Sequence, residues 1–146
     1  MIGLLQRVSR AEVRVDEREV AAIGPGLLVL VGVQRDDGAA QAERLLERLL
    51  SYRVWPDAKG KMNLSLRDNG HGLLLAPQFT LAADTAKGTR ASFTSAAEPG
   101  VARALFAHLV DRARASHPQV ACGVFGADMQ VSLINDGPVT FWIEAR

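Results

Sequence analysis

Two short apolar segments constrain the fold of this 146-residue chain more than any other feature. Leu27–Val33 is a run of leucine and valine interrupted only by Gly32, and Leu73–Phe79 begins with three leucines. Each segment is far too short to span a bilayer. Apolar runs of this length between turn sequences are typical of strands that are buried on both faces. The rest of the chain must therefore cover both sides of a sheet.

Helical periodicity is present in two further segments. The apolar stripe of the first predicted helix comprises Ala42, Leu45, Leu46, Leu49 and Leu50. The second helix is predicted to begin after Ser95–Glu98, which has capping-box spacing, and to end near His117. Its predicted stripe comprises Val101, Leu105 and Leu109. Each stripe needs an apolar surface to pack against.

Alternating apolar and polar residues predict the remaining strands, at Ile2–Val15, Glu19–Ile23, Tyr52–Trp55, Ala127–Ile134 and Val139–Ala145. Two helices are too few to cover both faces of so many strands. We therefore expect an α/β fold with three α/β/β layers, in which two sheets pack together and the two main helices cover one outer face. Because the sequence has no repeat or linker, residues 1–146 are predicted to form a single domain.

The net charge and the cysteine content indicate which partners and which cellular compartment to expect. The net charge is +1, whereas a dedicated duplex-binding protein usually carries a clear basic excess. DNA is therefore not an expected partner, and contact with RNA would depend on a few local cations. The single cysteine, Cys122, excludes an internal disulfide. The first residues lack the basic and apolar regions of a signal peptide, so we expect a cytoplasmic protein with no membrane contact.

Common catalytic signatures are absent from the sequence. It has no nucleophile elbow, P-loop or zincin motif, and Gly24–Gly26 precedes a strand rather than the helix that a dinucleotide site requires. His71, His108 and His117 do not have metal-ligand spacing, so neither a metal nor another cofactor is expected. Two classes stay open, a binding module and an enzyme whose chemistry is supplied by backbone groups and by the substrate.

Two motifs bear on this choice. Pro77–Leu81, with the sequence PQFTL, ends the second buried strand, and Asn135–Thr140, with the sequence NDGPVT, joins the last two strands. Alone, each has an ordinary interpretation, as the end of a core strand and as a hairpin turn. Together they resemble the two signature motifs of the D-aminoacyl-tRNA deacylase family. The resemblance covers nearly the whole chain and includes, in the expected order, Leu4–Val8, Gly60–Leu64, Leu81–Asp84 and Ala127–Val131.

This resemblance implies a homodimeric enzyme that hydrolyses the ester between a D-amino acid, or glycine, and the 3′-terminal adenosine of tRNA. It also implies a cis peptide bond between Gly137 and Pro138, although only about one X-Pro bond in twenty is cis in folded proteins. In the family this segment reaches into the partner subunit's active site, where its backbone would collide with an L-side chain. Arg7 would hold the segment in place through carbonyl groups.

The resemblance places the ester beside Gln78, Phe79 and Thr80. The amides of Phe79 and Thr80 would stabilise the oxyanion, an effect worth roughly 3 kcal/mol per donor in typical enzymes. Gln78 would hold the adenosine, and the ring of Phe79 would offer a stacking surface. Thr80 is an alternative nucleophile, but no histidine or lysine is recognisably placed to activate it, so we favour assistance by the 2′-OH of the adenosine. Pro77 and Met129 would support the site.

The family comparison also raises questions at individual positions. Lys87 and Arg90 are candidates for contacting acceptor-stem phosphates, and a solvated charged loop is an equal alternative. The chain has Pro77 where the family usually has serine, and Ala91 where it usually has proline. Phe79 agrees with the family, whereas a related group that edits certain L-aminoacyl-tRNAs has methionine there. Pro77 gives some weight to a non-catalytic RNA- or protein-binding module, and a small-molecule esterase is a third hypothesis.

Overall fold

Six strands form one hydrogen-bonded sheet in the computed structural model, which describes residues 1–146. The strands follow the order β2-β1-β3-β6-β7, and β8 pairs with β1; β4 and β5 form a separate two-stranded sheet. The elements are β1 (Ile2–Val15), β2 (Arg18–Ile23), β3 (Gly26–Gly32), α1 (Ala39–Ser51), β4 (Trp55–Pro56), β5 (Met62–Leu64), α2 (Leu66–Asn69), β6 (Gly72–Pro77), the 3-10 helix η1 (Phe79–Ala82), α3 (Pro99–Ser116), β7 (Val120–Cys122) and β8 (Gln130–Glu144).

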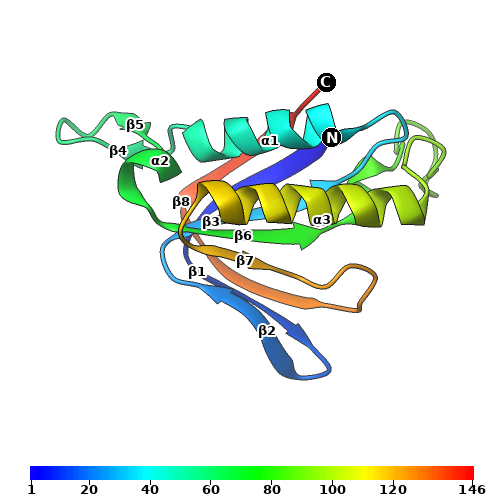
Figure 1. The fold of residues 1–146 in the computed structure, drawn as a ribbon, viewed down its shortest axis with the longest axis horizontal. Coiled ribbons are helices and arrows are strands. Elements are labelled where there is room, and N and C mark those ends of the chain that lie inside the picture. The colour runs from blue at the N-terminus through cyan, green and yellow to red at the C-terminus, as the bar shows by residue number, and fades with distance from the viewer.

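The long strands β1 and β8 each pass through two layers of the molecule. The first half of β1 pairs with β3 and with the end of β8, whereas Ala11–Val15 pairs with β2 and with the start of β8. Register shifts interrupt the β1–β8 ladder between Gln6 and Arg10. The sheet bends in this region, so that β2 and the adjoining parts of β1 and β8 lie beneath β3 and β6 (Figure 1).

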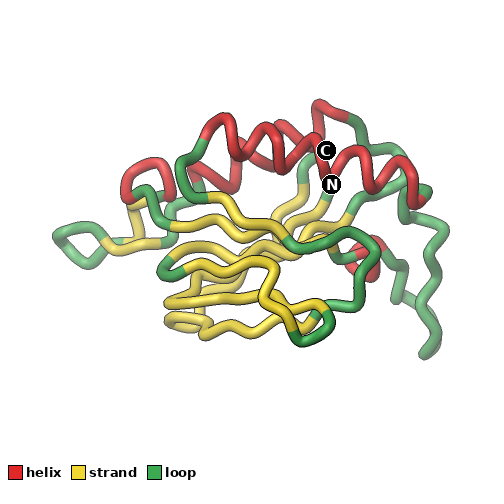
Figure 2. The backbone as a smooth tube through the Cα atoms, turned by 60° about the horizontal axis from the view of Figure 1, so that its bottom comes forward, coloured by secondary structure: helices red, strands yellow, loops and turns green.

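Two apolar clusters separate the resulting three layers. The larger cluster lies between the helices and the sheet and includes Leu27, Val29 and Val31 of β3. The smaller cluster lies on the opposite face and includes Leu28 of β3, together with Val13 of β1. Successive residues of β3 therefore enter different cores, which explains its continuous apolar sequence. The expected α/β/β layering is confirmed, with both long helices on one outer face (Figure 2).

The two long helices match their predicted positions but differ in detail. All five residues of the predicted stripe of α1 are buried. The predicted stripe of α3 is confirmed at Leu109 but wrong at Val101, which is 47% exposed; the buried face runs through Phe106, Leu109 and Ala113. The capping-box prediction is also wrong, because Glu98 is the N-cap and the Ser95 hydroxyl donates to the Ala82 carbonyl. Neither these helices nor any other is both long and apolar enough to cross a membrane.

Short elements and element ends depart most from the sequence prediction. The second buried strand ends at Pro77, and the predicted strand end at Phe79 is instead the start of η1. Of the strand predicted at Tyr52–Trp55, only Trp55 lies in a strand, β4, and the predicted pair of C-terminal strands forms the single element β8. The elements β5 and α2 were not predicted. Each has four residues or fewer, and so short a segment carries little periodic signal.

Candidate active site

The change from β6 to η1 positions the first motif. The backbone amide of Gln78 donates to the Val31 carbonyl (2.8 Å). This hydrogen bond holds the chain against β3 for one residue after β6 ends. The first hydrogen bond of η1 then runs from Leu81 N to the Gln78 carbonyl (3.3 Å). Because the amides of Phe79 and Thr80 come before that bond, the helix offers them no partner. Two adjacent backbone donors are therefore available at the end of β6.

Side-chain contacts fix the orientation of the same three residues. The Gln78 Nε2 group donates to the Thr80 Oγ1 atom (2.7 Å). The Phe79 ring stacks on Phe93, with ring centroids 4.7 Å apart and an interplanar angle of 21°. Both rings remain more than 40% exposed, so one aromatic surface is open to solvent. Such a surface can accept a nucleobase by stacking.

A pocket of about 480 Å³ adjoins this turn. Pro77, Gln78 and Phe79 contribute to one part of its lining, and Met129, the residue before β8, contributes to another. The remaining lining residues are Leu30, Ala76, Pro99, Phe125, Gly126, Ala127, Asp128 and Val131. Asp128 is the only charged residue in this lining, and no histidine, lysine or cysteine is present. The pocket therefore contains no histidine or lysine that could activate a hydroxyl nucleophile, and Asp128 supplies its only carboxylate.

Pro77 fits its position at the end of β6. The last β6–β7 pair joins Leu75 to Cys122, so Pro77 lies beyond the end of β7. A proline lacks the backbone N–H, but at this point no strand residue requires that donor. On its other side Pro77 pairs with Val31, and the following Gln78 amide completes that contact. Pro77 therefore leaves the backbone path intact and contributes no hydroxyl to the pocket wall.

The second motif forms a bulge in β8 beside Arg7. The Gly137–Pro138 peptide bond is cis. The Arg7 Nε atom donates to the Asp136 carbonyl (3.1 Å), and its Nη1 atom donates to the Val54 carbonyl (2.5 Å). One largely buried guanidinium thus joins the bulge to the chain segment that leads into β4. Gly137 and Pro138 are themselves exposed.

A single chain does not bring the two motifs together. In the register of the sheet, Pro77 is level with Val31 and Gly3, whereas the bulge is level with Arg7. The motifs are separated by four residues along β1, from Gly3 to Arg7, and by the three spacings between the strands β6, β3, β1 and β8. At standard strand dimensions they are roughly 19 Å apart. Neither Gly137 nor Pro138 lines the pocket. Met129 is the one predicted residue from the C-terminal part of the chain that does.

The remaining predicted residues lie in the loop that follows η1. Lys87 and Arg90 are both exposed, and neither forms an ion pair. Backbone hydrogen bonds between Asp84 and Ser92 close the base of this loop. Because Phe93 follows directly and stacks on Phe79, the loop begins and ends beside the pocket. Its two cations are therefore carried near the aromatic surface.

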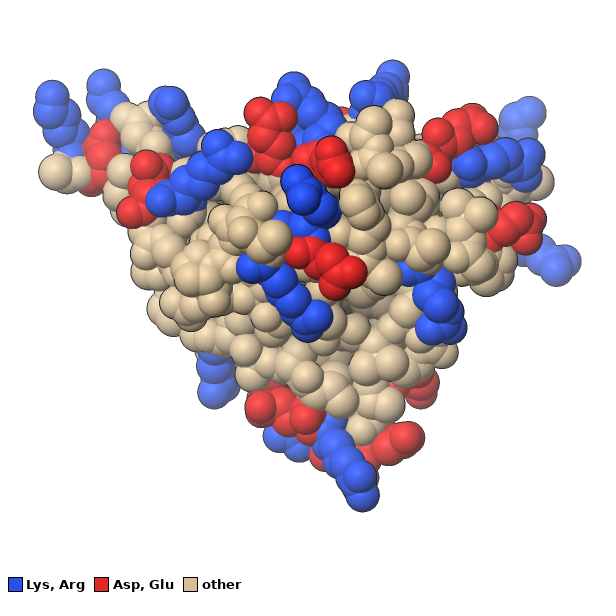
Figure 3. Space-filling model, viewed as in Figure 1, with Lys and Arg blue, Asp and Glu red and all other residues tan.

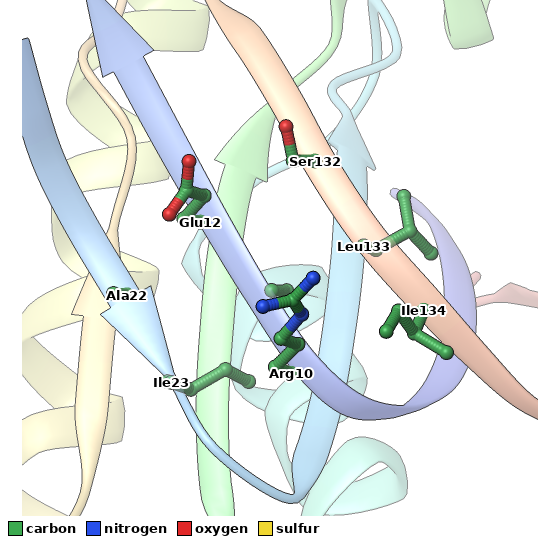
Figure 4. A pocket seen from close by; sticks show the side chains of 8 residues that line it. Arg10, Glu12, Ala22, Ile23, Ser132, Leu133 and Ile134 are labelled. Atoms are coloured by element: carbon green, nitrogen blue, oxygen red, sulfur yellow. The ribbon is translucent and has the colours of Figure 1, made fainter.

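A second hollow, of about 380 Å³, lies on the outer side of the small β layer. Figure 4 shows Arg10 and Glu12 of β1 between Ile23 of β2 and Ser132 of β8. None of the predicted site residues lines this hollow. Ser132 is the only hydroxyl in its lining, and the carboxylate of Glu12, its cross-strand partner, accepts a hydrogen bond from Arg14 instead. Of the two motifs, only the first contributes residues to a pocket, the one of about 480 Å³.

Sequence reasoning missed three residues around that pocket. Phe93 forms the aromatic pair with Phe79, and Phe125 and Asp128 line the wall opposite the first motif. Phe93 had a detectable signal, since it is a large aromatic residue within a polar loop. The contribution of Phe125 depends on the packing of the loop between β7 and β8, which no local pattern indicates.

Comparison with known proteins decides the family. The sequence profile of the D-Tyr-tRNA(Tyr) deacylase family matches residues 4–144. The chain belongs to this family. A D-aminoacyl-tRNA deacylase of Thioalkalivibrio sulfidiphilus is 69% identical over 144 residues, covering 99% of this chain and 97% of that protein. A D-aminoacyl-tRNA deacylase of Alkalilimnicola ehrlichii is 64% identical over 146 residues, covering 100% and 97%.

Two solved structures have the same fold as this chain. A structure described as the c-Myc DNA unwinding element binding protein has a TM-score of 0.95 at 34% identity, covering 100% of this chain and 99% of that one. Another, described as a probable eukaryotic D-amino acid tRNA deacylase, has a TM-score of 0.82 at 19% identity, covering 98% of both chains. The second likeness concerns the fold alone. The resemblance inferred from the two sequence motifs is thus confirmed at the level of the family.

Proposed function

We propose that this protein hydrolyses the ester bond of D-aminoacyl-tRNA and releases a free D-amino acid and tRNA. The observation that carries the proposal is the pair of unpartnered amides at Phe79 and Thr80, beside a pocket and an exposed aromatic surface. An ester carbonyl placed at this turn would have two donors for the negative charge that develops during attack. Glycyl-tRNA is included as a substrate, because glycine has no side chain to be excluded.

Water, rather than a protein hydroxyl, is the proposed nucleophile. The Thr80 hydroxyl is engaged by Gln78, and no histidine or lysine lines the pocket to remove its proton. The 2′-OH of the terminal adenosine lies next to the ester in the substrate itself. It would position the attacking water, while Gln78 and the exposed face of Phe79 hold the nucleoside. The reaction uses no metal or other cofactor in this mechanism.

Chiral selection would require a second copy of the chain. The roughly 19 Å between the two motifs prevents the Gly137–Pro138 bulge from closing its own pocket. In the proposed homodimer the bulge of one subunit closes the pocket of the other. Arg7 fixes the bulge through the Asp136 carbonyl, so its backbone would present a firm wall to an L-side chain. A D-side chain would point away from that wall, and its identity would matter little.

The protein is proposed to act in the cytoplasm. The tRNA would bind with its 3′-terminal adenosine in the pocket and its acceptor stem outside. Lys87 and Arg90, on the loop beside the aromatic pair, are the proposed phosphate contacts near the pocket. The first test is hydrolysis of D-tyrosyl-, glycyl- and L-tyrosyl-tRNA by the purified protein. Release of D-tyrosine and glycine, without release of L-tyrosine, is expected. Equal rates for the two tyrosine enantiomers would overturn the proposed selection.

A matched pair of variants tests the role of the backbone donors. Phe79→Pro removes one amide hydrogen at the first position of η1, where proline is sterically tolerated. Phe79→Ala loses the same ring but keeps the amide. In single-turnover assays with excess enzyme, the proline variant should be roughly 100-fold slower than the alanine variant, the usual effect of losing one oxyanion donor. Equal rates for the two variants would contradict the assignment.

A further inference from the structure

The hairpin formed by β4 and β5 projects from the body of the molecule at the end opposite the loop that carries Lys87 and Arg90. Figure 1 shows this projection, and Figure 3, in the same view, shows lysine and arginine side chains there with acidic side chains between them. Arg53, Lys59, Lys61 and Arg67 are all exposed in and around the hairpin. Asp57 is the only acidic residue from Arg53 to Arg67. The segment therefore carries a local positive charge in a chain whose net charge is only +1.

Asp57 organises the hairpin without neutralising its lysines. Its Oδ1 atom accepts hydrogen bonds from the backbone amides of Lys59 (2.8 Å) and Lys61 (3.0 Å), and its Oδ2 atom accepts one from Asn63 (2.8 Å). Both carboxylate oxygens are thus occupied, and neither lysine has an ion-pair partner. A turn braced in this way presents two free ammonium groups in a limited set of positions.

The base of the hairpin is attached to the Gly137–Pro138 bulge. The guanidinium of Arg7 donates both to the Asp136 carbonyl in the bulge and to the Val54 carbonyl, one residue before β4. The bulge and the base of the hairpin are therefore separated only by the guanidinium group of Arg7, and a ligand that contacts the bulge lies close to the hairpin. From Trp55 to the tip the hairpin extends at most about 16 Å, five residues at the strand rise. Its lysines lie within reach of a nucleic acid whose end contacts the bulge.

We infer that the β4–β5 hairpin is an RNA-binding arm that acts in trans, with Lys59 and Lys61 contacting acceptor-strand phosphates of the tRNA bound in the partner subunit's pocket. The inference rests on the proposed function and on the cross-subunit position of the bulge. Lys87 and Arg90 would contact the same RNA from the subunit that owns the pocket. The two subunits would thus hold one acceptor end from opposite sides.

The main test is the double variant Lys59→Gln/Lys61→Gln. Asp57 binds the backbone amides of these residues, so side-chain replacement leaves the turn intact. On duplex DNA, each phosphate contact adds about 0.9 to the slope of log affinity against log salt concentration, which corresponds to about eightfold in affinity between 1 M and 0.1 M salt. In single-turnover hydrolysis of D-tyrosyl-tRNA, the half-saturating enzyme concentration should rise at least tenfold at 0.1 M KCl. The plateau rate should not change.

The matched control is Arg44→Gln/Arg112→Gln on the outer helical surface, which removes the same charge from side chains that are 58% and 56% exposed. It should change the half-saturating concentration less than twofold. A hairpin variant that behaves like this control would overturn the RNA-binding role. A lower plateau rate with an unchanged half-saturating enzyme concentration would also overturn the RNA-binding role. Failure of the wild-type protein to release D-tyrosine would instead refute the proposed function itself.

Mixed dimers test whether the arm acts in trans. A subunit with a silenced pocket, Phe79→Pro, is paired with a subunit whose pocket is intact, and the hairpin lysines are neutralised in only one of them. Neutralising the hairpin lysines of the silenced subunit should raise the half-saturating enzyme concentration. Neutralising those of the active subunit should leave it unchanged. The opposite result would assign the hairpin to its own pocket and overturn the inference. A monomeric active protein would also overturn it.

Discussion

Adding one methyl group at Gly32 should slow the reaction by moving η1. Gly32 ends β3 directly against the turn that carries the two amides. A Cβ atom built on it would lie 2.8 Å from Leu81 Cβ and 3.3 Å from Ala82 N, both fixed near or on the backbone of η1. Ordinary contact begins at 3.4 Å, so Gly32→Ala requires a displacement of about 0.6 Å. Misplacement by 1 Å can cost about 100-fold in rate.

The expected result is therefore roughly a tenfold lower single-turnover rate for D-tyrosyl-tRNA. Overpacking at such a position typically costs about 1–3 kcal/mol of unfolding free energy. For a chain of this size that corresponds to a fall in Tm of about 2–10 °C, measurable by circular dichroism. The rate is measured well below the lowered Tm, so that both proteins are fully folded.

Two glycine controls separate local displacement from general destabilisation. At Gly3 an added Cβ would lie 3.2 Å from Leu45 Cδ1 and Val29 Cγ1, which are flexible side-chain ends in the core. Gly3→Ala should lower the Tm but leave the rate within twofold of wild type. At Gly24 nothing lies within 4 Å, so Gly24→Ala should change neither quantity. The reasoning fails if Gly32→Ala reacts at the wild-type rate, or if Gly3→Ala slows the reaction equally.

Three further outcomes follow from contacts in and near the site. Phe93→Ala should raise the half-saturating enzyme concentration about threefold to tenfold in the same assay, since the stack with Phe79 is worth about 0.5–1.5 kcal/mol; an unchanged value would show that the aromatic surface does not bind substrate. Thr80→Val should retain at least a tenth of the plateau rate, because only the hydroxyl bonded to Gln78 is lost; complete inactivity would instead support a nucleophilic threonine. Hydrogen bonds from Asn63 and two backbone amides lower the pKa of Asp57. Its stabilisation of the hairpin is therefore present above about pH 4 and lost as the pH falls through the lowered pKa, and a carboxyl-carbon NMR midpoint at or above about 3.9 would contradict this.

The layers of the fold could be predicted because they depend on strong local patterns. The stripe from Ala42 to Leu50 and the apolar run of β3 each reflect burial that repeats along one element. The conversion of Phe79 from a predicted strand end to a 3-10 turn depends on β7 ending early and on Gly32 lying behind the turn. Neither partner is near Phe79 in sequence. Local propensity therefore could not indicate this change.

The candidate site was predictable only through the family motifs. No periodic pattern distinguishes Gln78 from other residues at strand ends, or indicates that Arg7 bonds to both Val54 and Asp136. Phe125 and Asp128 reach the pocket through the packing of the loop between β7 and β8, which is a tertiary property. The roughly 19 Å separation of the two motifs became visible only when the strand register was known.

The passage of β1 and β8 through both β layers has a consequence for how the enzyme would discriminate between enantiomers. Two continuous backbones cross the bend, so the layers cannot swing apart without breaking covalently connected ladders. The shape against which an incoming amino acid is compared is then set when the protein folds, before any substrate arrives. Under the proposed mechanism, rejection of an L-amino acid would therefore need no closing movement of the protein.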